Sequence, residues 1–133
     1  MNWDTEWPLI KAKADEYGID PYFIAAIRSQ ENGGPGKEFG VLSVPAPTYD
    51  DQLNVACETV LNRLIDYAIN DDPLCSYLLQ GKKHRRLIYN DAFMKHFSGI
   101  WAPIGAPNDP NGLNADWFSG VKYFYFSFLS TKI

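Results

Sequence analysis

Apolar residues recur every three or four positions through most of the chain, the spacing that places them on one face of an α-helix. The first such segment covers residues 4–17 and ends at Gly18. A second begins with Asp20 as its N-cap and Pro21 at its first helical position, and it ends at the glycine pair 33–34. The pattern therefore predicts a mainly helical protein.

The helical spacing is lost between this glycine pair and residue 48. Within that stretch only residues 39–44 favour an extended backbone, and they predict a short strand or hairpin. Thr48 and Asp51 then have the spacing of a capping box, which predicts the start of a helix over residues 49–69. Its apolar stripe is unbroken, so we expect this helix to be the central one.

Shorter helices are expected over residues 73–79 and 91–97, followed by a long loop. Asn114 is the expected N-cap of a last helix that carries Trp117. A chain of 133 residues has the size of one domain. We therefore expect residues 1–133 to form a single domain of mainly α, α+β-like class, with one short β element after the second helix.

The charge balance argues against a nucleic-acid-binding protein. Twelve Lys and Arg residues stand against sixteen Asp and Glu residues, for a net charge of −4. The basic run at residues 82–86 is interpreted as a solvated surface, with attraction to anionic envelope polymers as the alternative. No apolar run is long enough for a membrane span, and nothing at the N-terminus has the pattern of a secretory signal. We therefore expect a chain made in the cytoplasm.

The cysteines and histidines do not predict a metal centre. Cys57 and Cys75 are too few for a disulfide scaffold, and Cys57 is expected to pack as a small buried apolar residue. A single bridge between the two cysteines stays open. His84 and His96 have no recognised zinc spacing with them, and no phosphate-binding glycine loop occurs. We expect neither a metal nor another cofactor.

Glu31 is the most informative residue for chemistry. On the second predicted helix it falls on the same side as Ile24 and Ile27, so its carboxyl continues an apolar stripe at the helix C-terminus. Burial and the negative end of the helix dipole both favour the protonated carboxyl, which can donate a proton. The alternative is that Glu31 turns aside to meet Arg28, one turn earlier, or water.

Two segments of the chain resemble a known family. GIDPYFIAAIRSQENGG, followed by FGVLSV, resembles the signature of soluble lytic transglycosylases and goose-type lysozymes. FSGIWAPIGAPNDPNGLNADWFSGV resembles a segment of lysozyme-like proteins from phages and prophages. The resemblance implies a lysozyme-like domain that cleaves the peptidoglycan strand between N-acetylmuramic acid and N-acetylglucosamine. It also implies that Glu31 is the catalytic acid.

The resemblance implies substrate-binding residues as well. Tyr89, next to Asn90, resembles a Tyr-Asn pair that helps to position the sugar. Trp101 lies at the start of the loop that would cover the substrate, with packing into the core as the alternative, and Trp117 is expected to be a core residue. The full predicted set of substrate-binding residues is Gly40, Leu42, Ser43, Tyr89, Trp101, Asn108 and Asp109.

The reaction type depends on whether a second carboxylate faces Glu31. The candidates are Glu38, Asp50, Asp51 and Asp109. Asp50 and Asp51 are also typical first-turn residues of a helix, and Asp109 is a typical turn former. Resemblance to lytic transglycosylases implies that none is needed, because there the N-acetyl group of the substrate assists and its 6-hydroxyl attacks. A hydrolytic muramidase or glucosaminidase on the same fold is the alternative.

Two residues depart from the family pattern. Asn32 stands where the family has Ser after the catalytic Glu, and Ser43 stands where it has Gln. These departures favour a further alternative, a non-catalytic virion or envelope module that only binds peptidoglycan. The main expectation is a small monomeric endolysin of a phage or prophage, which another protein releases to the cell wall.

Overall fold

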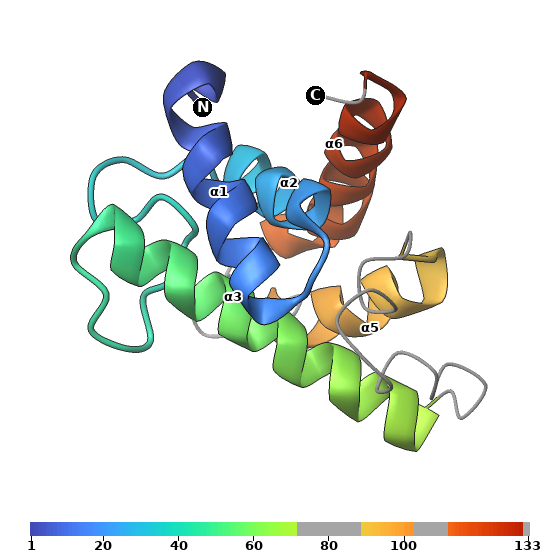
Figure 1. The fold of residues 1–133 in the computed structure, drawn as a ribbon. Coiled ribbons are helices and arrows are strands. Elements are labelled where there is room, and N and C mark those ends of the chain that lie inside the picture. The colour runs from blue at the N-terminus through green and yellow to red at the C-terminus, as the bar shows by residue number, and fades with distance from the viewer. Residues whose placement is uncertain (72–88, 103–111, 132–133) are drawn as a thin grey trace.

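The computed structural model describes residues 1–71, 89–102 and 112–131, and every regular element in these ranges is helical. The elements are α1 Trp3–Tyr17, α2 Pro21–Glu31, α3 Tyr49–Asp66, the π-helical turn η1 Tyr67–Asp71, α5 Asp91–Trp101, the 3-10 turn η3 Leu113–Asp116 and α6 Trp117–Thr131 (Figure 1). The prediction of a mainly helical chain is confirmed.

Side chains just outside the helices fix where α2 and α3 begin. The carboxylate of Asp20 accepts a hydrogen bond from the amide of Tyr22 at 2.9 Å, and Pro21 occupies the first helical position. Thr48 and Asp51 form a reciprocal capping box. Both arrangements satisfy amide groups that a helix N-terminus leaves without partners. The predicted starts of the two helices are confirmed.

The ends of α1 and α2 are set by residues that tolerate the left-handed conformation. Gly18 ends α1 with φ 68°, and Asn32 ends α2 with φ 47°. Asn is the residue other than Gly that adopts this conformation most readily, because its short side chain bonds locally. The asparagine at position 32 therefore has a structural reason in this chain.

α2 is the central helix of the described structure, where we expected α3. Residues 23–27 are fully buried, and α2 packs against both α1 and α6 (Figure 1). Gly120 of α6 lies so close to the side chain of Gln30 that a Cβ atom there would overlap it. α3 buries only one face and leaves Glu58 exposed, so its apolar stripe marks a helix that covers the core from one side.

A buried cluster of hydroxyl and carboxyl groups joins the start of α2 to α5 and α6. The hydroxyl of Tyr125 donates to Asp20 Oδ2 at 2.5 Å and accepts from the amide of Tyr89 at 2.9 Å. The hydroxyl of Tyr89 accepts from the amide of Asp20 at 3.1 Å. Burial and the neighbouring carboxylate of Asp20 raise the pKa of Tyr125 far above its ordinary value. The neutral phenol therefore persists at neutral pH, where it donates to Asp20.

Several predicted elements need correction. Residues 39–44 form no strand, because buried backbone groups of this segment bond to a side chain of α3 instead of to a second strand. The predicted helix 49–69 continues through a π-helical turn to residue 71, and the helix predicted at 91–97 extends to residue 101. Asn114 lies inside the 3-10 turn η3, whose N-cap position is Gly112.

The prediction for Cys57 is confirmed, whereas other predictions concern residues that the structure does not describe. Cys57 is fully buried with a free thiol, as a small core residue, and burial raises its pKa to about 12. Cys75, the helix predicted at 73–79 and the basic run 82–86 lie outside the described residues. Among the helices that are described, none has both the length and the apolar character needed to cross a bilayer.

Candidate functional site

Glu31 is the last residue of α2, and two tryptophans hold its carboxyl. Trp101 Nε1 donates to Glu31 Oε1 at 3.0 Å, and Trp117 Nε1 donates to the same oxygen at 2.9 Å. Trp101 ends α5 and Trp117 begins α6, so the site joins three helices that are far apart in the sequence. Arg28 does not bond to the Glu31 carboxyl and pairs with Glu6 instead. The alternative in which Glu31 turns aside to meet Arg28 is therefore wrong.

Gly40 lies against the other carboxyl oxygen of Glu31. Its φ is 71°, and a Cβ atom built on it would overlap Glu31 Oε2 and the carboxyl carbon. The position therefore requires glycine for two reasons, its left-handed backbone and the lack of space. Among the described residues, Oε2 has no hydrogen-bond partner, whereas Oε1 has two.

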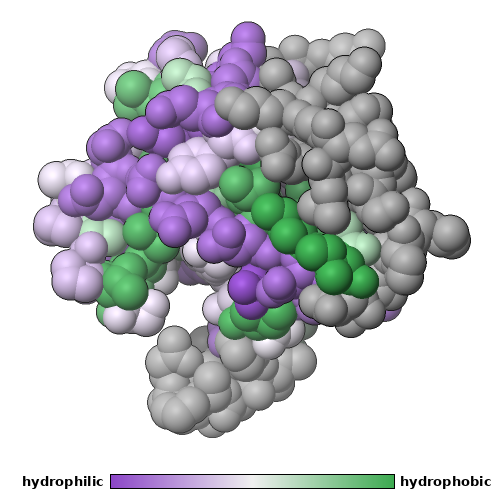
Figure 2. Space-filling view, turned by 60° about the horizontal axis from the view of Figure 1, so that its bottom comes forward, coloured by the Kyte–Doolittle hydropathy of each residue, from purple (hydrophilic) through white to green (hydrophobic). Residues whose placement is uncertain are grey.

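A groove of about 340 Å³ opens beside this carboxyl. The connecting loop between α2 and α3, residues 32–48, supplies one wall, and α3 and α5 supply the others. The lining residues are Gly40, Val41, Leu42, Ser43, Val55, Thr59, Ile100 and Trp101. Leu42 and Ile100 are 67% and 44% exposed, so apolar side chains reach solvent at the rim. Figure 2 shows one face of the molecule with a deep hollow in its surface and with both hydrophilic and hydrophobic residues at the rim.

The structure brings most of the predicted site residues together. Glu31 lies against Gly40 and bonds to Trp101, and Gly40, Leu42, Ser43 and Trp101 line the same groove. Asn108 and Asp109 lie outside the described residues, so their predicted roles stay predictions.

Tyr89 is a correction to the predicted site. Its side chain is only 4% exposed, and its ring packs against Phe23 and Phe93 while its hydroxyl bonds to the amide of Asp20. A tyrosine enclosed in this way cannot touch a substrate in the groove. Its role is to hold the start of α2 against α5 and α6.

None of the described candidates for a second carboxylate lines the groove. Glu38 lies beside Glu6 and Arg28, at a separate hollow. Asp51 accepts the amide of Thr48 in the capping box, and Asp50 pairs loosely with Lys13 at 3.8 Å. The interpretation of Asp51 as a first-turn residue is confirmed. The remaining candidate, Asp109, is not described.

Sequence reasoning missed two residues of the site. Trp117 was expected only as a core residue, and it is buried, with 5% of its surface exposed. Its indole N–H nevertheless donates to Glu31. The signal was that a buried indole N–H needs an acceptor. Gln52 was missed entirely. The sequence signal that could have indicated it is an amide side chain next to Leu53 on the apolar face of α3.

The arrangement can hold one carboxyl group rigidly and leave one of its oxygens for chemistry. An indole N–H only donates, so two indoles fix Oε1 as an acceptor. In the protonated carboxyl, Oε1 is then the carbonyl oxygen and Oε2, next to the groove-lining Gly40, carries the proton. In the described parts of the chain, no three His, Cys, Asp or Glu side chains gather as a metal site would require.

Comparisons of this chain with protein-family models, with curated proteins and with solved structures gave no match.

Proposed function

We propose that this chain is a glycosidase that cleaves the glycan strand of bacterial peptidoglycan between N-acetylmuramic acid and N-acetylglucosamine. The observation that carries the proposal is the setting of Glu31: two indoles fix its Oε1, while its Oε2 has no hydrogen-bond partner among the described residues and lies next to Gly40 of the groove wall. The resemblance of the GIDP…EN segment to lytic transglycosylases gives the same residue the role of acid. The residues of the groove wall, Gly40, Leu42 and Ser43, coincide with the turn of that resemblance.

In the proposed reaction, Glu31 acts first as general acid and then as general base. Oε2 gives its proton to the glycosidic oxygen, and the bond from that oxygen to the anomeric carbon of N-acetylmuramic acid breaks. The N-acetyl group of the same sugar stabilises the positive charge at the anomeric carbon. Glu31 then takes the proton of the sugar's 6-hydroxyl as this oxygen attacks, which yields a 1,6-anhydro end and regenerates the acid.

The single-acid reaction is favoured over hydrolysis by the composition of the groove. None of the described residues that line the groove carries a carboxylate, and Glu31 lies next to two of them, Gly40 and Trp101, whereas an inverting hydrolase needs a second carboxylate at about 6.5–9.5 Å from the acid. Its apolar surfaces at Leu42, Ile100 and Trp101 suit the flat faces of sugar rings. We further propose a monomeric endolysin of phage or prophage type that meets the wall after release by another protein.

The mass of the released fragments tests the reaction type. Purified peptidoglycan is digested with the wild-type protein, and the soluble fragments are analysed by mass spectrometry. We expect fragments lighter than the hydrolysis products by the mass of a water molecule. Fragments of full hydrolytic mass would instead assign a hydrolase and make Asp109 the first residue to replace. No fragments from several wall types would favour a module that only binds peptidoglycan.

Replacing Gly40 by alanine is expected to disable the site more than it weakens the fold. Alanine in the left-handed conformation costs about 1–2 kcal/mol, and its Cβ would displace the Glu31 carboxyl. A displacement of about 1 Å can lower a catalysed rate by roughly 10²-fold. Fragment release and thermal unfolding are measured on the same preparation.

Gly112→Ala is the matched control for Gly40→Ala. Gly112 also has a left-handed backbone, φ 67°, but a Cβ atom there meets nothing within 4 Å. Both variants should therefore lose the stability that alanine costs in a left-handed backbone, while only Gly40→Ala loses fragment release. Equal activity of the two variants would contradict the assigned contact between Gly40 and Glu31.

A further inference from the structure

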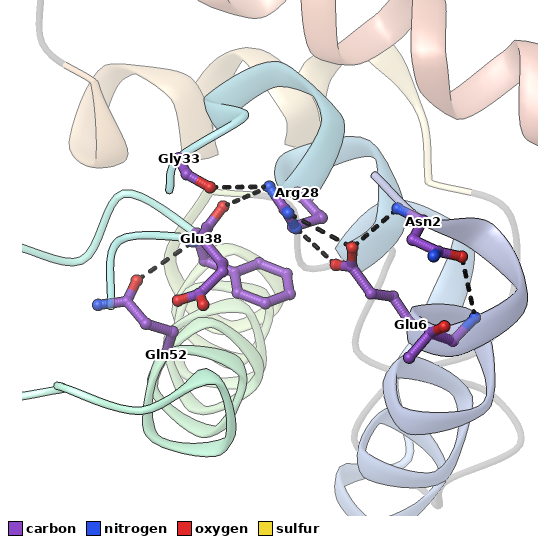
Figure 3. A network of polar contacts seen from close by, with 8 residues as sticks. Asn2, Glu6, Arg28, Gly33, Glu38 and Gln52 are labelled. Atoms are coloured by element: carbon purple, nitrogen blue, oxygen red, sulfur yellow. Dashed lines mark hydrogen bonds and ion pairs between the residues drawn. The ribbon is translucent and has the colours of Figure 1, made fainter. Parts of the chain in front are cut away.

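Gln52 is a polar side chain with no exposed surface, and it lies on the core face of α3. Its Oε1 accepts the amides of Phe39 and Val41 at 3.2 and 3.1 Å. Its Nε2 lies 2.9 Å from three backbone carbonyl oxygens, those of Gly36, Val41 and Ala46. Five contacts thus join this one amide side chain to the connecting loop, and Gln52 takes the place of a neighbouring strand. Figure 3 draws one of them, the bond from the amide of Phe39 to the Gln52 oxygen.

These contacts lie on both sides of Gly40, the residue that lies against the Glu31 carboxyl. Gly40 lies between Phe39 and Val41, and the amides of both neighbours converge on the same oxygen of Gln52. Gly40 itself donates only to the carbonyl of Lys37, in a local turn. Gln52 thus holds, from α3, the backbone on both sides of the residue that lies against the Glu31 carboxyl.

The same contacts orient the wall of the groove. Val41 bonds to Gln52 through both its amide and its carbonyl group, so its backbone has one orientation. Leu42 and Ser43 follow directly and line the groove. A loop without helix or strand has no ladder of its own, and buried backbone groups that lose their partners are costly. Without Gln52, this wall would lack a fixed shape.

We propose that Gln52 is a positioning residue, which holds Gly40 against Glu31 and fixes Val41–Ser43 as the groove wall. Its catalytic consequence rests on the proposed function, but its structural consequence does not. Because Gly40 confines the carboxyl from one side and the two indoles hold it from the other, a released loop should change the environment of both indole groups.

The test uses Gln52→Met, which keeps the length of the side chain and removes all five contacts. The chain has four tryptophans, so its indole N–H groups give four NMR signals. We expect the signals of Trp101 and Trp117 to shift while those of Trp3 and Trp7 stay. Fragment release by this variant should fall by roughly 10²-fold through the displaced acid.

Asn54→Leu is the matched control for Gln52→Met. Asn54 lies on the same helix, and its amide oxygen accepts the hydroxyl of Tyr17 at 2.7 Å. The control therefore also removes a side-chain amide of α3, but it does not touch the connecting loop. It should leave the signals of Trp101 and Trp117 and the fragment release unchanged.

The outcomes distinguish a failure of this proposal from a failure of the proposed function. Unshifted signals of Trp101 and Trp117 in a folded Gln52→Met variant would overturn the positioning role, whatever the activity. If the wild type releases no fragments but these signals shift, the positioning role stands and the proposed function fails.

If Gln52→Met does not fold, hydrogen exchange of the wild-type protein tests whether Gln52 holds the connecting loop. The amides of Phe39 and Val41 should exchange at least about 100-fold more slowly than unprotected amides, because their acceptor is fully buried. Unprotected exchange at both amides would overturn the proposal.

Discussion

Replacing Glu31 by glutamine is expected to lower the rate of peptidoglycan cleavage by about 10²- to 10⁴-fold while the fold stays intact. The amide oxygen of glutamine can still accept both indole N–H groups, so the side chain keeps its place. The amide nitrogen that replaces Oε2 has no acidic proton to give to a leaving oxygen. The rate of fragment release and the circular dichroism spectrum of the variant check the two parts of this expectation.

Glu58→Gln serves as the control for Glu31→Gln. Glu58 is exposed on α3 and does not line the groove, so its replacement should leave the rate unchanged. Sedimentation with insoluble peptidoglycan should show that Glu31→Gln still binds the wall. A Glu31→Gln variant that keeps more than a tenth of the wild-type rate would exclude Glu31 as the acid.

Local signals in the sequence predicted the helices well because they act over a few residues. Asp20 with Pro21, and Thr48 with Asp51, satisfy backbone amides of their own helices, so their spacing alone is sufficient. The same reasoning failed at residues 39–44, where the backbone of Phe39 and of Val41 bonds to Gln52 on the next helix. A run of apolar residues does not reveal which distant side chain will satisfy its backbone.

The candidate site was predictable only in part for the same reason. Glu31 stood out because a carboxyl on an apolar stripe needs an explanation, and Gly40 followed from the resemblance. The bond from Trp117 to Glu31 joins residues 86 positions apart, and no spacing rule reaches that far. Tyr89 was misassigned because a tyrosine has the same sequence signal whether its hydroxyl meets a sugar or a buried amide.

Removing the guanidinium of Arg28 is expected to destabilise the protein by about 3–5 kcal/mol. Arg28 is 8% exposed and donates from Nε to Glu6 Oε1 at 2.6 Å, and from another nitrogen to the carbonyls of Gly33 and Glu38 (Figure 3). Arg28→Met would leave the carboxylate of Glu6 buried without its counter-ion. Urea unfolding at neutral pH measures the loss.

Arg63→Met is the control for Arg28→Met, because Arg63 pairs with Asp66 within one helix where both side chains reach solvent. That variant should lose less than about 1 kcal/mol. The double variant Glu6→Gln/Arg28→Met should recover part of the loss, since no unpaired charge stays buried. Equal losses in the two arginine variants would contradict the assigned role of the buried pair.

The stabilisation that the Glu6–Arg28 pair provides is expected to decrease at acidic pH. Burial alone would raise the pKa of Glu6, but hydrogen bonds from the side chain of Arg28 and the backbone of Asn2 give a net lowering. The stabilisation is therefore complete above the ordinary glutamate pKa and disappears as the pH falls through the lowered value. The stability difference between wild type and the double variant should shrink over that acidic range. Because Arg28 also holds Gly33 and Glu38, acid should loosen the segment that leads from Glu31 to Gly40.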